Sequence, residues 1–273
     1  PAGGTGGSQE GDGNAAIRNF AEGDFSSIQP AEAIEHESSL LVERCEIRED
    51  SGGAGAYRGG PGLRRDIRLV SETGSLSVAS NKNVIPPFGV NSGMAGAPNT
   101  FVVYRDGKAL QPSDSPGNVA NYPLIKDDIV SISSSGGGGW GDPLTRDPNA
   151  VLLDVRSRFI SLDSAEKVYG VVLRNMALDL KATDKLRNKL SKARMFFAVI
   201  VRSDDGANNG EEGSYAYCEL APKAFNRLGL DPTTPIELVA PFGPVLRAWA
   251  RPSKKVASGK VRISSLSKKI IGL

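Results

Sequence analysis

The stretch Ser51–Gly62 reads Ser-Gly-Gly-Ala-Gly-Ala-Tyr-Arg-Gly-Gly-Pro-Gly, so six of its twelve residues are glycine. Flexible linkers are rich in Gly and Ser without bulky residues, whereas this stretch contains Tyr57 and Arg58 and lies between segments with the composition of strands. Glycine permits positive φ and a close approach of other backbone, at an entropic cost when it is ordered. The stretch therefore predicts either tight corners or another segment packed against bare backbone.

A second glycine run, Gly136–Gly139, continues as Trp-Gly-Asp-Pro-Leu-Thr-Arg-Asp-Pro over 140–148. Its backbone amides could cradle a phosphate, but the run lacks the Lys-Ser/Thr ending of a P-loop, and Trp140 stands where a helix should begin. We therefore favour buried corners of the backbone in both blocks. The glycines expected to build them are Gly52, Gly53, Gly59, Gly60, Gly136, Gly137, Gly138 and Gly139.

Together the two blocks resemble the C-terminal half of a B-type subunit in the hydantoinase B / 5-oxoprolinase family, where an SGGAGxxRGGxG block precedes a GGGGxGDPxxRDP block. The pair is far more specific than either glycine run alone. The resemblance runs from about Ile28 to Leu173 and includes Leu41–Arg48 and Val151–Leu173. Subunits of acetophenone and acetone carboxylases are related to the same family.

This resemblance implies a role in a multisubunit ATP-dependent enzyme. An A-type subunit would use ATP and Mg²⁺ to phosphorylate the oxygen of a cyclic amide, and the B-type subunit would support attack on the activated intermediate. We expect part of a hydantoinase- or oxoprolinase-type hydrolase. A related ketone carboxylase and a non-catalytic scaffold subunit remain the alternatives, and no cofactor site is evident in this chain.

The chain is also expected to need partners. It resembles a split subunit or a fragment without the N-terminal half of a B-type subunit, so it should be inactive alone. It should act with the A-type subunit and that missing half in a hetero-oligomer on a small-molecule substrate. Residues 1–13 contain almost no apolar side chains, so we expect them to be mobile unless they thread into a partner.

Composition argues against several other classes. The 33 basic and 31 acidic residues are interleaved along 273 residues, which predicts no field that would gather nucleic acid. No apolar run approaches the roughly 20 residues of a membrane span, and a cytoplasmic location is expected. Cys45 and Cys218 are predicted to be buried thiols. His36 is the only histidine, which makes a zinc site or a Ser-His-Asp triad improbable.

The expected fold class is α+β and mainly β. Between Leu40 and Ser133, alternating apolar residues and the Asp106-Gly107 turn predict antiparallel strands. Short helices should follow, with Asp147 and Asp163 as N-caps and a third helix over 182–194. The expected divisions are a glycine-rich segment (1–27), an antiparallel glycine-cornered module (28–173), a helical connector (174–194) and a small β-barrel-like domain (195–273).

Candidate substrate- or partner-binding residues come from the two blocks: Ser51, Tyr57, Arg58, Trp140 and Asp142. Arg58 could clamp an anion through its planar fork, but we favour bonds to carbonyls among the glycines. Asp142 could act as a general base, but its Gly-Asp-Pro setting favours a turn residue. Glu35, His36 and Glu37 are assigned to a charged loop, and the basic residues of 251–270 to a lysine-protected edge strand rather than an acidic-partner site.

Overall fold

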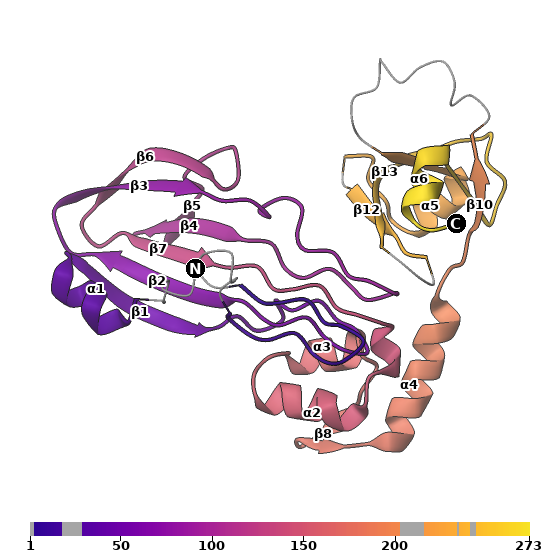
Figure 1. Ribbon diagram of the computed structural model, residues 1–273, viewed down its shortest axis with the longest axis horizontal. Helices are drawn as coiled ribbons and strands as arrows, with labels where there is room; N and C mark the ends of the chain where they lie inside the picture. The colour runs from indigo at the N-terminus through magenta and orange to yellow at the C-terminus, as the bar shows by residue number, and fades with distance from the viewer. Residues whose placement is uncertain (1–2, 18–28, 203–215, 234, 241–243) are drawn as a thin grey trace. The chain divides into compact units, whose positions relative to one another are not determined.

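The computed structural model describes residues 3–17, 29–202, 216–233, 235–240 and 244–273 (Figure 1). The chain divides into two compact units, the first formed by Pro1–Gly89 and Gly93–Asn188 and the second by Val90–Ser92 and Lys189–Leu273. Strands outweigh helices, and the sheets of the first unit are antiparallel throughout. The predicted mainly β fold is confirmed.

The first unit contains a five-stranded antiparallel sheet and a separate two-stranded sheet. The first has the order β1 (Leu40–Ile47), β2 (Leu63–Leu69), β7 (Ile129–Ser133), β4 (Thr100–Arg105) and β5 (Lys108–Leu110), and the second pairs β3 (Thr73–Ala79) with β6 (Asn118–Ile125). Leu69, Val103, Leu124 and Val130 form the core between them. The β4–β5 hairpin turns at Asp106 and Gly107, both with positive φ, as predicted.

Short helices follow the second glycine block. They are η2 (Pro143–Thr145), α2 (Pro148–Arg156), α3 (Leu162–Lys167) and α4 (Leu180–Ala193), with the short pair β8 (Leu173–Arg174) and β9 (Ala177–Leu178) before α4. Asp147 caps α2, as predicted, by accepting from Asn149 N. The Asp163 cap is wrong, because Ser161 Oγ accepts from Ser164 N and α3 begins at Leu162.

Two other expectations are corrected, one for Glu35, His36 and Glu37 and one for Cys45. Glu35, His36 and Glu37 lie in a helix, α1 (Ala31–Glu37), because the segment Ala-Glu-Ala-Ile-Glu-His-Glu is rich in helix-forming residues and lacks Gly and Pro. Glu35 also accepts a hydrogen bond from Val42 N (2.9 Å) in the following strand. Cys45 is exposed on β1, where its neighbours are charged, while Cys218 lies in the core of the second unit, where burial raises its pKa to about 11. Both cysteines are free thiols.

The second unit is built around one five-stranded sheet. Its order is β10 (Ala198–Val201), β14 (Lys260–Ile263), β11 (Tyr217–Leu220), β13 (Leu246–Pro252) and β12 (Pro235–Leu238), with α5 (Pro222–Arg227) and α6 (Ser265–Ile270). The β10–β14 and β11–β13 pairs are parallel, and the β11–β14 and β12–β13 pairs are antiparallel. The barrel-like closure of this unit stays a prediction.

Four glycine-rich segments of the first unit, 3–14, 51–62, 93–97 and 134–141, form what we call the glycine bundle. Figure 1 shows long segments without helix or strand running side by side from the first sheet toward α2 and α3. Their backbones are hydrogen-bonded directly: Gly53 N to Gly137 O (2.8 Å), Gly60 N to Thr5 O (2.8 Å) and Met94 N to Ala54 O (2.7 Å). The bundle therefore satisfies buried backbone groups outside any regular sheet.

Close packing explains the glycines of the bundle. A Cβ at Gly137 would lie 1.9 Å from Thr5 O, and one at Gly136 would lie 1.9 Å from Ser51 O. None of the eight glycines expected to form corners has a positive φ. The other predicted use of these glycines, another segment packed against bare backbone, is therefore observed, and their role as corners stays a prediction.

The N-terminal segment also differs from expectation. Residues 1–13 were expected to be mobile in the absence of a partner, but those that the structure describes, 3–13, lie inside this chain's own bundle. Gly7 N donates to Gly138 O (2.8 Å), and Gly13 N donates to Arg58 O (2.8 Å). The segment is ordered although it has few apolar side chains to bury, because backbone hydrogen bonds and contacts with bare backbone hold it in place.

Replacing Gly137 by alanine should destabilise the first unit by about 1–3 kcal/mol or more, because the added Cβ overlaps a backbone oxygen that cannot rotate away. Scanning calorimetry of the first unit's transition measures this change. Gly11→Ala is the matched control, since nothing lies within 4 Å of a Cβ at Gly11, and it should cost less than about 0.5 kcal/mol. A Gly137→Ala protein that melts with the parent would contradict the packing account.

Candidate functional site

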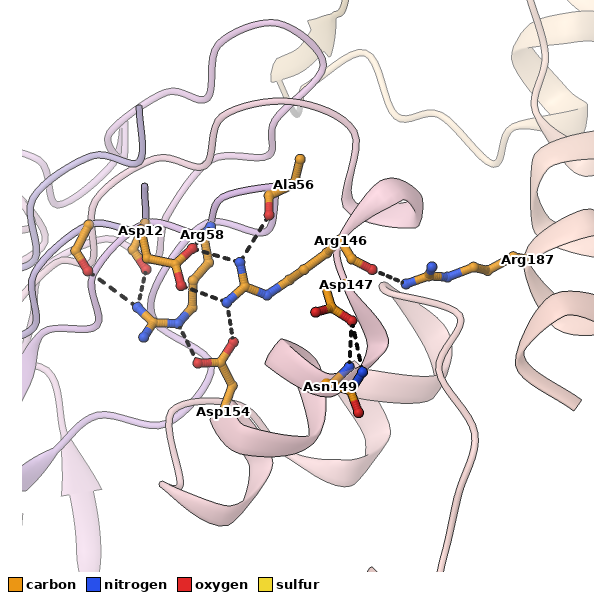
Figure 2. Close-up of polar contacts among 10 residues, drawn as sticks. Asp12, Ala56, Arg58, Arg146, Asp147, Asn149, Asp154 and Arg187 are labelled. Carbon is orange, nitrogen blue, oxygen red and sulfur yellow. Dashed lines mark hydrogen bonds and ion pairs between the residues drawn. The ribbon is translucent and has the colours of Figure 1, made fainter. Parts of the chain in front are cut away.

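Four charged side chains meet where the glycine bundle contacts α2, and we call them the four-charge network (Figure 2). Arg58 Nε lies 2.8 Å from Asp154 Oδ1, and Arg146 Nη2 lies 2.7 Å from Asp154 Oδ2. Arg146 also binds both oxygens of Asp12, at 2.6 and 2.7 Å. One carboxylate thus bridges two guanidinium groups, and one guanidinium bridges two carboxylates.

Each member comes from a different part of the chain. Asp12 belongs to the N-terminal segment, Arg58 to the first glycine block and Arg146 to the end of η2, and Asp154 lies in α2. Arg58, Arg146 and Asp154 are only 6%, 3% and 4% exposed. Burying such charges is costly unless they are paired and hydrogen-bonded. Two arginines and two aspartates balance, so the network joins the four segments without an uncompensated charge.

Arg58 also uses its remaining donors within the chain. Its Nη1 donates to the carbonyls of Gly13 and Gly59, both at 3.3 Å, and its guanidinium carbon lies 4.5 Å from the centre of the Phe159 ring. Its backbone N donates to Asp12 Oδ1 (2.8 Å). These bonds agree with the favoured assignment of Arg58 to carbonyls of the glycine block and add an ion pair that sequence reasoning did not find.

Arg146 extends the network toward α4. It donates to Ala56 O (3.0 Å), while its own carbonyl accepts from Arg187 Nη2 (2.6 Å), as Figure 2 shows. Arg187 Nε also donates to Tyr169 O (3.0 Å). Tyr169 is fully buried, its Oη has no hydrogen-bond partner among the described residues, and burial raises its pKa.

The network shifts the ionisation of Asp12 and Arg146. Burial alone would raise the pKa of Asp12, but the hydrogen bond and charge of Arg146, with the charge of Arg58, hold it below its ordinary value. Burial alone would lower the pKa of Arg146, but Asp12 and Asp154 raise it. Because the folded pKa of Asp12 is lowered, its contribution to stability is present above its unfolded pKa and is lost as the pH falls through the folded one.

Two of the predicted site residues hold local structure. Ser51 is 1% exposed, donates through Oγ to Arg48 O (2.5 Å) and accepts from Gly62 N (2.9 Å). The side chain of Asp142 accepts from Leu144 N (2.9 Å) and caps η2, as expected of a turn residue. A general base needs access to a substrate, and the hydrogen bond of Asp142 serves the helix instead.

Tyr57 and Trp140 lie together on the bundle. Their backbones exchange two hydrogen bonds, at 3.0 and 2.8 Å, and their ring centres are 5.9 Å apart. Tyr57 is 38% exposed, unlike Ser51 and Arg58. Of the predicted binding residues, Tyr57 is the exposed one, and a contact of this aromatic pair with a partner remains a prediction.

The second glycine run does not offer a phosphate cradle. Gly137 N donates to Gly60 O (2.9 Å), and Gly139 N donates to Met94 O (2.9 Å). A Cβ at Gly138 would lie 1.7 Å from Phe88 O, so other backbone already occupies the space beside the run. The chain's residues here therefore do not fit ATP phosphates.

Within the described ranges, no group of three or more His, Cys, Asp or Glu side chains is placed to hold a metal ion. The same residues contain no helix with the length and apolarity of a membrane span.

Sequence reasoning missed Asp12, Arg146 and Asp154 as members of a site. Arg146 lies inside the second block, so its place in the Arg-Asp-Pro sequence was a usable signal. Asp154 offered a second signal, because it interrupts an apolar helix face and is buried beside Val151 and Val155. Asp12 gave none, since its partner Arg146 is 134 residues away.

This chain is similar to several known proteins. The family model described as hydantoinase B/oxoprolinase matches residues 1–143. An uncharacterised protein of Methanocaldococcus jannaschii is 41% identical over 58% of this chain and 28% of its own length. The acetone carboxylase alpha subunit of Xanthobacter autotrophicus is 29% identical over 68% of this chain and 28% of its own length.

A solved structure, the ATP-dependent caprolactamase from Pseudomonas jessenii, superposes with a TM-score of 0.58 and 28% identity, over 68% of this chain and 33% of that one. The chain thus spans a third or less of the length of these relatives. The family model covers more than half of the chain and includes the whole glycine bundle. The chain belongs to the hydantoinase B/oxoprolinase family.

Proposed function

We propose that this chain is part of a multisubunit ATP-dependent cyclic-amide hydrolase, in which it supplies a rigid glycine bundle rather than a complete active site. The observation that carries the proposal is the burial of Arg58 and Arg146, the charged residues of the two family blocks, in a network that they share with Asp12 and Asp154. Charged groups paired in this way position segments and are not open to a substrate.

Similarity to the ATP-dependent caprolactamase supports the choice of reaction, since a lactam is a cyclic amide. ATP use belongs on an A-type partner subunit in this proposal, with Mg²⁺, because the amides of Gly137 and Gly139 are bonded to carbonyls of this chain. The remaining part of a B-type subunit would complete the active site. The pair of exposed Tyr57 and half-buried Trp140 is the proposed contact of the bundle with those partners.

The second candidate is a related ATP-dependent ketone carboxylase. Similarity to the acetone carboxylase alpha subunit over 68% of this chain favours it. The family resemblance implies that both reactions begin with phosphorylation of a carbonyl oxygen. We give the bundle the same positioning role in both candidates. The two are separated by the substrate whose turnover the complete assembly supports.

The purified chain alone should hydrolyse neither ATP nor cyclic amides such as caprolactam or hydantoin. The reason is that Arg58 and Arg146, the arginines of the two glycine blocks, are engaged in the buried four-charge network. Phosphate release and ring opening are the measurements, and a mock purification is the control. ATPase activity that rises in proportion to the chain and exceeds the mock value would contradict the proposal.

Arg58→Ala should destabilise the first unit by about 3–5 kcal/mol, since it leaves a buried carboxylate with one partner fewer. Any activity of the assembled complex should fall together with its melting temperature. Arg174→Ala is the control, because the Arg174–Asp179 pair is exposed, and surface pairs contribute at most about 1 kcal/mol.

Arg58→Lys sharpens this test. Lysine keeps the charge but loses the planar fork that reaches Asp154 and two carbonyls together. We expect partial destabilisation and a matching partial loss of activity. An Arg58→Ala complex that assembles and melts like the parent, yet loses most of its turnover, would instead give Arg58 a direct role in the reaction.

A further inference from the structure

The sheet of the second unit has two unlike faces. Alternate residues of its inner strands, including Cys218, Leu220, Ala248, Ala250, Val261 and Ile263, form the buried core. The residues between them point to the opposite face because strand side chains alternate. That opposite face carries charged and aromatic side chains, and the strand register brings them together.

We call this opposite side the basic face. Its cross-strand neighbours include Tyr217 beside Trp249, Glu219 beside both Arg251 and Arg262, and Glu237 beside Arg247. Among the described residues it holds five basic and two acidic ones: Arg202, Arg247, Arg251, Lys260 and Arg262 against Glu219 and Glu237. Within this described part of the chain, basic side chains therefore outnumber acidic ones on the face.

These positions correct an expectation from the sequence. The basic residues of 251–270 were assigned to a lysine-protected edge strand, but Arg251 lies on β13 and Lys260 and Arg262 lie on β14. Both strands have neighbours on each side, and the end strands of the sheet are β10 and β12. Protection of a sheet edge does not explain basic residues on inner strands.

Arginines are held in place on the basic face. The guanidinium carbons of Arg202 and Arg251 lie 3.8 and 4.3 Å from the ring centre of Tyr217. Arg262 Nε donates to Glu219 (2.5 Å), which lowers the pKa of that carboxyl group, and Arg247 Nε donates to Glu237 (2.8 Å). A guanidinium group stacked on a ring keeps its donors in its own plane, the geometry that binds carboxylates.

The two units of the chain also differ in charge. Residues 189–273 carry 14 Lys and Arg against 7 Asp and Glu, whereas residues 1–188 carry 19 against 24. The overall charge of +2 hides this asymmetry. Complementary charge between surfaces steers association and fixes its register, so the basic face fits a surface rich in carboxylates.

Nucleic acid is a poorer fit than an acidic protein. Sheet faces that bind single strands stack bases on exposed aromatic rings. Here Tyr217 already stacks with two guanidinium groups. The pairs Arg247–Glu237 and Arg262–Glu219 show that guanidinium groups on this face bind carboxylates.

We propose that the basic face of the second unit is a docking surface for a carboxylate-rich surface of a partner protein. This site is separate from the four-charge network and does not depend on the proposed function.

The test uses the full chain and poly-L-glutamate, with single-stranded oligo-dT of equal charge as the comparison, and measures binding by fluorescence anisotropy at several salt concentrations. We expect poly-L-glutamate to bind, more tightly than oligo-dT, with an affinity that falls as salt rises. The double variant Arg251→Gln/Lys260→Gln should weaken binding about tenfold or more. Circular dichroism and thermal melting check that it folds.

The double variant Lys223→Gln/Arg227→Gln is the matched control. It removes the same charge from exposed positions on α5 and should change the affinity less than about twofold. Equal loss in both double variants, or no binding by the parent, would overturn the proposal. Tighter binding of oligo-dT that the Arg251→Gln/Lys260→Gln variant abolishes would assign the face to nucleic acid instead.

Two further outcomes would assign another occupant. The chain itself contains acidic residues at Asp204, Asp205, Glu211 and Glu212. If poly-L-glutamate binds only after these four are replaced by Asn and Gln, the chain's own acids occupy the face. If light scattering shows association of the parent that the Arg251→Gln/Lys260→Gln variant abolishes, the occupant is a second copy of the chain.

Discussion

Direct contact between backbones is the constraint on which the first unit depends. In the glycine bundle, carbonyl oxygens lie so close to the glycines that a Cβ atom would overlap them. A Cβ on Gly137, for example, would lie 1.9 Å from Thr5 O. Buried N–H and C=O groups must be hydrogen-bonded, and here they bond across segments far apart in sequence. Only glycine permits both conditions at once, although it loses more conformational entropy than other residues on ordering. Four segments are thereby fixed without a regular sheet.

A bundle of bare backbone has few side chains with which to contact the rest of the protein, and the four-charge network provides that contact. Asp12 and Arg58 project from the bundle, and Asp154 and Arg146 meet them from α2 and the end of η2. Arg187 then ties α4 to the same place through Arg146 O. This arrangement gives the arginines of the two glycine blocks in this chain a structural role, and it supports the positioning role proposed for them.

Features governed by local chemistry could be predicted from the sequence, and features governed by distant contacts could not. The Asp147 cap and the Asp106-Gly107 turn depend on a few neighbouring residues, and both are observed. Asp163 failed as a cap because Ser161 competes for the same role two residues earlier. The geometry of the glycines and the Asp12–Arg146 pair depend on segments that meet only in the folded chain. The bonds of Arg58 to carbonyls of the glycine block were predicted, but its bond to Asp154 was not.

Amide hydrogen exchange in the parent chain measures the central claim most directly. If the bundle is an ordered, hydrogen-bonded element, the amides of Gly53, Gly60 and Gly137 should exchange as slowly as those of the β2–β7 ladder. Peptides spanning the bundle and the sheet would then show the same protection. Rapid exchange throughout the bundle, while the β2–β7 amides remain protected, would contradict the account.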